Sequence, residues 1–274
     1  MTTTSTAFDA FSARFDNGEP QLISRVLIAD TQTPVSAYLK LASGKPHSFL
    51  LESVEGGEIR GRFSVIGMAP DLIWRCRGDV AEINRDPEQT DKFETVDGAP
   101  VTALRALMAE SAMADTGDLP PMAAGLFGYF GYDMIRHIET VPDSNLPAID
   151  TPDSILLRPS LIAIFDRLRV SITLVTQIRP ADWDEAATAW NVAQSRINNA
   201  MLALEAPVPP PRLAATMPFC QNRNPTLQGP PLQRWSNAHV TISAPEISFR
   251  SYFRSAFRFR FTCLHSISIA VCAV

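Results

Sequence analysis

The sequence lacks several features that define large classes of proteins. It has no uninterrupted run of about 18 apolar residues, the length that a membrane-spanning helix needs, so we expect no membrane partner. Its N-terminus is polar and has no basic stretch followed by an apolar one, which predicts a cytoplasmic protein rather than a secreted one. Four cysteines among 274 residues do not make a disulfide framework.

Sites for metals and for nucleophilic catalysis are also missing from the pattern. The four histidines and four cysteines show no metal-ligand spacing, and no Ser-His-Asp or Cys-His set can be argued from the residues. The formal net charge of −5 argues against a general nucleic-acid binder. We therefore expect no catalytic residue, no metal, no cofactor and no nucleic-acid partner in this chain.

The composition changes at a proline-rich segment. Residues 1–212 carry 28 acidic and 18 basic residues, whereas residues 213–274 carry six arginines, no lysine and one acidic residue. Between them, APVPPPR (206–212) reads as a stiff polyproline-type linker. We predict a folded domain over residues 7–205, then the linker, then a tail over 213–274.

Strand and helix patterns follow one another irregularly in this domain. Helical periodicity is found in four segments: 7–17, 33–41, 101–111 and 181–205. Strand patterns are found at 22–30, 48–53, 63–67, 71–78, 80–84, 122–133, 161–166 and 170–177. Asp182 and Glu185 suit an N-cap and its capping-box partner for the last helix. Without regular β-α-β alternation, the pattern predicts an α+β domain with a mostly antiparallel two-sheet core flanked by helices, and a largely unstructured tail.

The segment LLESVEGGEIRGRFSVIG (50–67) is the most informative for function. A buried strand ends at Glu52 and Ser53, a diglycine turn follows, and a second strand returns with Arg60 and Arg62. The carboxylate, hydroxyl and guanidinium groups could form a pocket for a zwitterion such as an amino acid. They could equally form an exposed ion pair on a hairpin, and the residues alone leave both interpretations open.

The segment GLFGYFGYD (125–133) spaces three glycines through an aromatic strand pattern. It is not a dinucleotide fingerprint, because these glycines do not open a helix after a strand. Glycines within a strand indicate a bulge or a close approach of two backbones, so we predict a structural role.

These blocks, together with TPVSAYLKL (33–41) before them, resemble the N-terminal domain of anthranilate synthase component I. The resemblance covers about residues 8–212. Aminodeoxychorismate synthase component I shares parts of the blocks and is the alternative family. The resemblance implies that Ser53 contacts bound L-tryptophan, and that Glu52 and Arg62 complete this half of a feedback site. It also implies a glutamine amidotransferase partner, and places the chorismate, ammonia and Mg²⁺ chemistry in a further domain.

The tail resembles that further domain only in another reading frame. In the neighbouring frame, each codon takes the third base of one triplet and the first two of the next. Read this way, the stretch around 247–261 accommodates D-I-F-Q-V-V-L-S-Q-R-F-x-V-P-F, which resembles the opening of the family's catalytic domain. We therefore expect a truncated, catalytically inactive anthranilate synthase component I whose tail is out of frame. A stand-alone amino-acid-binding regulatory module is a second hypothesis.

Overall fold

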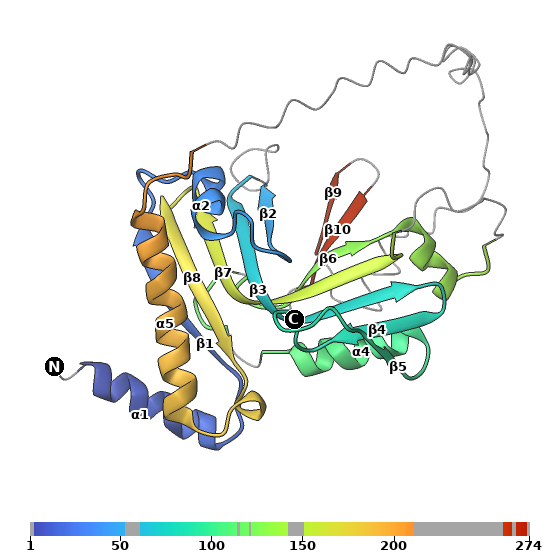
Figure 1. Cartoon of the computed structure of the whole chain (residues 1–274), viewed down its shortest axis with the longest axis horizontal. Coiled ribbons are helices and arrows are strands. Elements are labelled where there is room, and N and C mark those ends of the chain that lie inside the picture. Colours follow the sequence, from blue (N-terminus) through green and yellow to red (C-terminus); the bar gives the residue numbers. More distant parts are fainter. Residues whose placement is uncertain are drawn as a thin grey trace, which may run out of the picture.

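The computed structural model describes residues 3–52, 61–113, 116–120, 122–141, 151–210, 260–264 and 267–272 (Figure 1). Its helices are α1 (Thr3–Asp16), α2 (Pro34–Leu41), α4 (Pro100–Ser111) and α5 (Ala186–Glu205), with 3-10 turns η1 (Tyr132–His137) and η2 (Pro180–Asp182). Its strands are β1 (Gln21–Ile28), β2 (Phe49–Glu52), β3 (Phe63–Arg77), β4 (Val80–Asn84), β5 (Glu94–Val96), β6 (Leu126–Phe130), β7 (Ser154–Asp166), β8 (Ser171–Ile178), β9 (Arg260–Leu264) and β10 (Ile267–Cys272).

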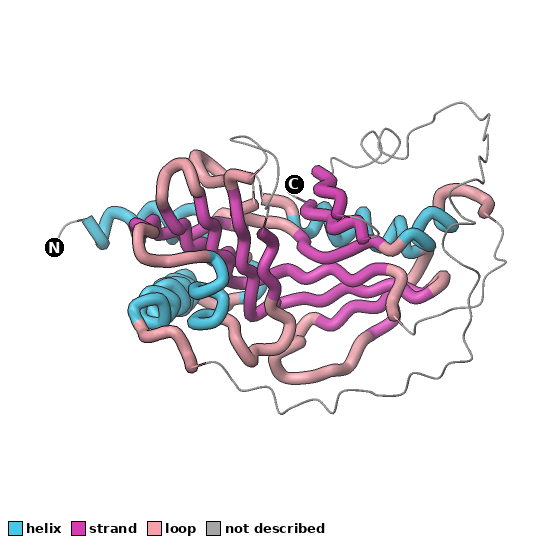
Figure 2. Tube along the Cα trace, turned by 90° about the horizontal axis from the view of Figure 1, so that it is seen from above, coloured by secondary structure: helices cyan, strands magenta, loops and turns pink. Residues whose placement is uncertain are grey.

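Within the described residues, all of these strands belong to one antiparallel sheet. Its main path runs β5-β4-β3-β7-β6-β10-β9, while β2 pairs with β3, and β8 joins β7 to β1. The long strands β3 and β7 run through both parts of the sheet, so the sheet divides into two halves that share them (Figure 2). The predicted α+β class and antiparallel core are confirmed, with the two expected sheets realised as two halves of one.

The sheet bends where two prolines face each other. Pro70 of β3 is paired in register with Pro159 of β7, and the register shifts between Pro70 and Leu72. Neither proline has an N–H to donate, so the ladder is weakened at this point. Ala69 has a positive φ of 49°, which sharpens the bend. The predicted break between strands 63–67 and 71–78 is therefore wrong: Pro70 bends a continuous strand rather than ending it.

The first residues of α2 and α5 are capped in different ways. The Thr33 side chain accepts a hydrogen bond from the Ser36 N–H at 3.1 Å, and the Ser36 hydroxyl accepts one from the Thr33 N–H at 2.9 Å. This capping box fixes the start of α2. The capping box predicted at Asp182 and Glu185 is wrong, because η2 occupies residues 180–182 and Glu185 caps α5 without a side-chain hydrogen bond.

Helices cover one face of each half of the sheet. The apolar stripe of α5 buries Ala193, Ile197, Ala200 and Leu204 completely or nearly so, and packs with α2 onto β3, β7 and β8. In the other half, α4 buries Ala103, Leu104 and Leu107 against Trp74 and Leu126. Both helices were predicted from their 3.6-residue periodicity, which is what this one-sided burial requires.

The opposite face carries a smaller apolar cluster that joins the two halves. Phe127 of β6 is fully buried there with Val65 and Ile164, and its ring stacks on Phe49 at a centroid distance of 5.2 Å. Phe49 lies directly over Gly67, where an added Cβ would meet the ring at 2.2 Å. The cluster therefore holds β2 against the sheet at the point where the tryptophan half-site is predicted.

The tail departs in one respect from the expected lack of structure. Eleven of its residues form β9 and β10, and β10 pairs antiparallel with β6, placing Ala270 opposite Gly128. The segment ISIAVC is rich in β-branched residues, and β6 offers an edge whose other side is taken by β7. Residues 211–259 lie outside the described part of the chain, as does Ser53.

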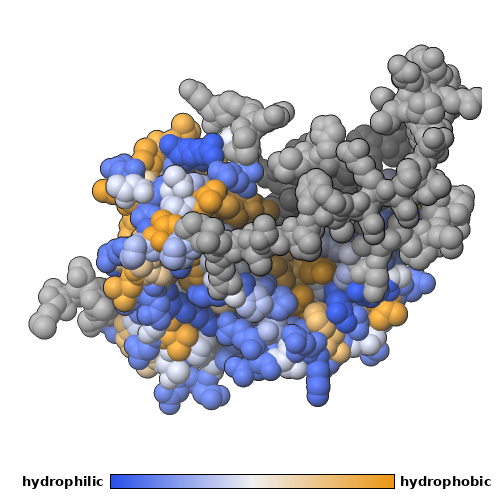
Figure 3. Space-filling model, turned by 45° about the horizontal axis from the view of Figure 1, so that its top comes forward, coloured by the Kyte–Doolittle hydropathy of each residue, from blue (hydrophilic) through white to orange (hydrophobic). Residues whose placement is uncertain are grey.

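Some hydrophobic side chains on the surface are scattered, whereas Val26, Ile28 and Val170 lie together at the edge strand β1. In the face shown in Figure 3, hydrophobic residues are interspersed with hydrophilic ones over the coloured surface. The most exposed large hydrophobic residues are Ile28, Tyr132, Leu202 and Val26. Exposure on this scale is ordinary for a folded domain. Among the described residues, no helix is both long and apolar enough to cross a membrane.

Candidate functional site

The predicted half-site lies where β2 ends beside the start of β3. Glu52 is the last residue of β2 and is paired in register with Ser64. Arg62 immediately precedes β3, so the antiparallel pairing brings both side chains to the same end of the sheet. Ser53, the third predicted residue, lies outside the described residues.

Arg62 is held by a carboxylate from another strand. Its Nε donates to Asp166 Oδ1 at 2.9 Å and its Nη2 to Asp166 Oδ2 at 2.5 Å, a two-pronged pairing. Asp166 is 5% exposed, and the hydrogen bonds from Arg62 hold the pKa of its carboxyl below the usual value. The backbone N–H groups of Leu168 and Arg169 also donate to Asp166, at 3.0 and 3.3 Å. Arg62 is thus fixed in place by a nearly buried anion.

Glu52 has a different basic partner. Arg167 Nη2 donates to Glu52 Oε1 at 3.0 Å, with the Arg167 side chain 48% exposed and that of Glu52 28% exposed. The Arg167 N–H also donates to the Arg62 carbonyl at 3.0 Å, which ties the β7–β8 turn to the start of β3. The structure therefore brings Glu52 and Arg62 to the same end of the sheet, but Arg62 is paired with Asp166 at the end of β7 and Glu52 with Arg167 in the turn that follows.

Asp166 and Arg167 are neighbours of the candidate site that the sequence did not single out. Asp166 ends β7 and pairs with Ser171 of β8, and Arg167 opens the turn between the two strands. The hairpin was predicted from its two apolar runs, but nothing in the motif around Glu52 indicates a partner more than 100 residues away. The signal available was the charged turn DRLR between two buried strands.

The arrangement offers both signs of charge to a ligand. Arg62 uses Nε and Nη2 for Asp166, and among the described residues no partner takes its remaining donors, which could bind an anion. Arg62 also lies over the Phe63 ring, 4.7 Å from its centroid. Leu51 and Phe63 belong to the apolar cluster beneath. A carboxylate, guanidinium groups and an adjacent apolar surface can recognise a zwitterionic aromatic molecule.

The Arg62–Asp166 pair predicts an acid-sensitive contribution to stability. Because the folded-state pKa of Asp166 lies below its unfolded value of about 3.9, the contribution is present above pH 4 and is lost as the pH falls through the folded value. Asp166→Asn is expected to lower the free energy of unfolding by about 1–2 kcal/mol at pH 7. Urea denaturation at pH 7 and pH 3 measures the effect, which should be smaller at pH 3.

Asp91→Asn serves as the matched control for this prediction. Asp91 is exposed, so the same change there should leave the free energy of unfolding within about 0.5 kcal/mol of wild type at both pH values. A loss for Asp166→Asn that is equal at pH 7 and pH 3 would show that ionisation of Asp166 does not stabilise the fold.

Other chemistry-bearing groups do not gather into a reactive site in the described residues. Cys76 is fully buried, and burial raises the pKa of its thiol to about 12, so it stays protonated near neutral pH. Its Sγ lies 3.7 Å from His137 Nε2. Among the described residues, no group of three His, Cys, Asp or Glu side chains could hold a metal ion.

Comparisons with known proteins identify the family. No family model matches the chain. It is 43% identical over 208 residues to "Anthranilate synthase component 1" of Cereibacter sphaeroides, covering 76% of this chain and 42% of that protein. It is 34% identical over 209 residues to the protein of the same name from Synechocystis sp., covering 75% and 40%. The chain thus spans about two fifths of the length of these curated relatives.

A solved structure has the same name. The crystal structure of anthranilate synthase component I from Streptococcus pneumoniae TIGR4 matches 67% of this chain and 37% of that one, with 22% identity and a TM-score of 0.45. The sequence relatives alone carry the assignment, because they agree in name and cover about three quarters of the chain. Over that part of its length, the chain belongs to the anthranilate synthase component 1 family.

Proposed function

We propose that this chain carries the tryptophan-binding half of an anthranilate synthase component I and makes no anthranilate by itself. The placement of the LLES block supports the proposed tryptophan binding. β2 delivers Glu52 beside Arg62 and Arg167, at the edge of an apolar cluster. The tryptophan carboxylate would lie against a guanidinium group and its ammonium group against Glu52, with Ser53 following in the chain.

The proposed inactivity is supported by how the relatives align. The matched region is about two fifths of each relative, so most of each relative has no counterpart in the alignment. We place the chorismate, ammonia and Mg²⁺ chemistry of the family in that remaining part, together with half of the tryptophan pocket. The out-of-frame match of residues 247–261 to the catalytic domain supports a frameshifted tail. Docking of a glutamine amidotransferase subunit is part of the same proposal.

The inactivity is tested by assay of the purified chain. Anthranilate fluorescence is followed with chorismate, ammonium and Mg²⁺, with heat-denatured protein as the blank. No turnover above the blank is expected. Measurable turnover that is retained through purification would overturn the proposed inactivity, and sequencing the gene across the codons for 205–235 would test the frame shift directly.

The binding half is tested by calorimetric titration with tryptophan. Half a pocket leaves part of the ligand in water, so we expect weak affinity, in the millimolar range, that Glu52→Gln lowers further. Asp91→Asn, remote from β2, is the control. Affinity that is unchanged in both Glu52→Gln and Ser53→Ala would contradict the assignment of these residues.

A further inference from the structure

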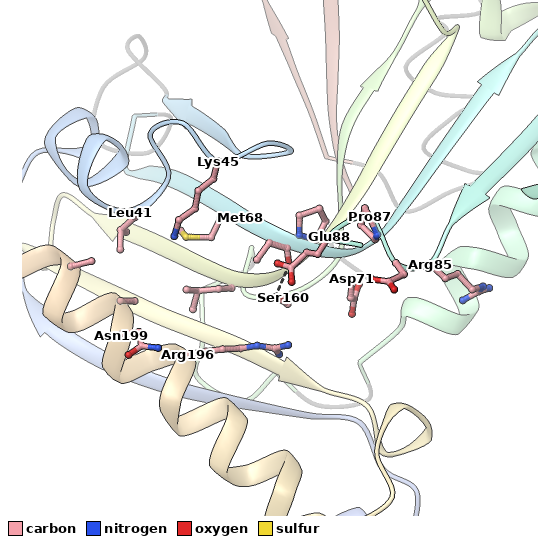
Figure 4. A pocket seen from close by; sticks show the side chains of 16 residues that line it. Leu41, Lys45, Met68, Asp71, Arg85, Pro87, Glu88, Ser160, Arg196 and Asn199 are labelled. Atoms are coloured by element: carbon pink, nitrogen blue, oxygen red, sulfur yellow. Dashed lines mark hydrogen bonds between the residues drawn. The ribbon is translucent and has the colours of Figure 1, made fainter. Parts of the chain in front are cut away.

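A cavity lies at the sheet bend, beside α5. It has a volume of about 500 Å³ and is bounded by α5, by the bend of β3 and β7, and by the turn after β4 (Figure 4). This volume is within the range of small-molecule sites. Neither Glu52 nor Arg62 lines it, so it is separate from the half-site at the end of β2.

The cavity contains a cation that the fold does not neutralise by contact. Arg196 points from α5 into the space beneath Ser160, as Figure 4 shows. It makes no hydrogen bond or ion pair with any other residue that the structure describes. Burial lowers its pKa, while Asp71 and Glu88 act in the opposite direction. A guanidinium stays charged in proteins, so a partly buried one without a partner favours an anionic ligand.

Two neighbouring charges are already satisfied within the fold. Arg85 donates to both carboxylate oxygens of Glu110 at 2.8 Å, and Arg158 donates to Asp71 at 2.7 Å. The other charged residues of the lining are Arg196 on α5 and Lys45 after α2, with Asp86 and Glu88 on the turn after β4 (Figure 4).

The turn that carries Glu88 is fixed by its own hydrogen bonds. Asn84 Nδ2 donates to the Thr90 carbonyl at 2.6 Å, and the Asp86 N–H donates to Asn84 Oδ1 at 2.9 Å. The Thr90 N–H donates to the Asp86 carbonyl at 3.0 Å. Glu88 is thus presented from an ordered turn, which lowers the entropic cost of using it for binding.

Part of the remaining lining is apolar, formed by Leu41, Met68, Leu161, Ala200 and Ala203, and part is polar, formed by Lys45, Asp86, Ser160 and Asn199. We propose that this cavity binds a small zwitterion with an apolar side chain, its carboxylate on Arg196 and its ammonium group toward Glu88. The apolar side chain lies against the wall formed by α2, β3 and α5. Opposite charges separated by a cavity match a zwitterion better than an ion of either sign, because a simple anion would also meet Glu88.

The experiment uses leucine as the probe with the full chain. Calorimetric titration should show saturable binding. Two analogues that each keep one charge, 4-methylpentanoate and 3-methylbutylamine, should bind at least tenfold more weakly. Arg196→Gln and Glu88→Gln should each lower leucine affinity at least tenfold, whereas Arg25→Gln, on the exposed edge of β1, should not change it.

Folding is checked by thermal melting of each variant. Glu88 lies in an exposed turn, so Glu88→Gln should fold normally. It therefore still tests the proposal if Arg196→Gln is too unstable to measure. Absence of leucine binding by the folded chain, or equal affinities for wild type and Glu88→Gln, would overturn the proposal. Tryptophan binding at Glu52 is measured with different variants, so either proposal can fail without the other.

Discussion

Replacing Gly128 with alanine is expected to lower the free energy of unfolding by about 3 kcal/mol, among the largest effects of any single methyl group in this fold. A Cβ at this position would lie 1.9 Å from the Ile155 carbonyl oxygen and 2.9 Å from its carbonyl carbon. Both obstacles are backbone atoms of β7, which is paired with β6 through Leu156 and its neighbours. The clash can be relieved only by separating the two strands. Urea denaturation followed by circular dichroism measures the loss.

Gly44→Ala separates this steric effect from the general cost of replacing glycine. Gly44 has a φ of 78°, but nothing lies within 4 Å of the Cβ that alanine would add. Its replacement should lower the free energy of unfolding by about 1 kcal/mol, because alanine disfavours the left-handed backbone conformation. Equal losses for the two variants would show that the close approach of β6 and β7 at Gly128 does not exclude a methyl group.

Gly128 also illustrates what the sequence could predict. Its place in an aromatic strand pattern indicated either a bulge or a close approach of two backbones, and the contact with Ile155 shows the second of these. Periodicity likewise located α4, α5 and β4, because each buries one face and its pattern is local. Local pattern could not show that β3 continues through Pro70. That continuity depends on Pro159 lying opposite, in a strand about 90 residues away.

The same limit applies to the candidate site. The sequence placed a carboxylate and guanidinium groups on one hairpin, and the structure brings Glu52 and Arg62 to one end of the sheet. It could not assign their partners, since Asp166 and Arg167 reach the site only through the pairing of β3 with β7. The pairing of β3 with β7 depends on the tertiary fold, whereas the hairpin motif predicts only the pairing of its own two strands.

The second large effect is expected from Arg158→Met. Arg158 is 5% exposed and donates to Asp71 at 2.7 Å and to Glu110 at 3.2 Å, joining β7 to β3 and to the end of α4. Methionine keeps the apolar part of the side chain but leaves Asp71 without this cation. The variant loses the hydrogen bonds from Arg158 to Asp71 and Glu110, and Asp71, 31% exposed, is left only partly solvated, so the free energy of unfolding should fall by about 2 kcal/mol in urea denaturation at pH 7.

Arg85→Met is the matched control, since Arg85 binds the same Glu110 carboxylate. Its two contacts to Glu110, 2.8 Å each, are shorter than the 3.2 Å contact that Arg158 makes with the same carboxylate, but its side chain is 56% exposed. An exposed pair is stabilised little because water screens both charges, so this variant should lose less than about 1 kcal/mol. Equal losses for the two variants would show that the burial of Arg158 adds nothing to its ion pairs. Comparing the two variants therefore tests whether the burial of Arg158 at the sheet bend makes its ion pairs more stabilising than the exposed pair of Arg85.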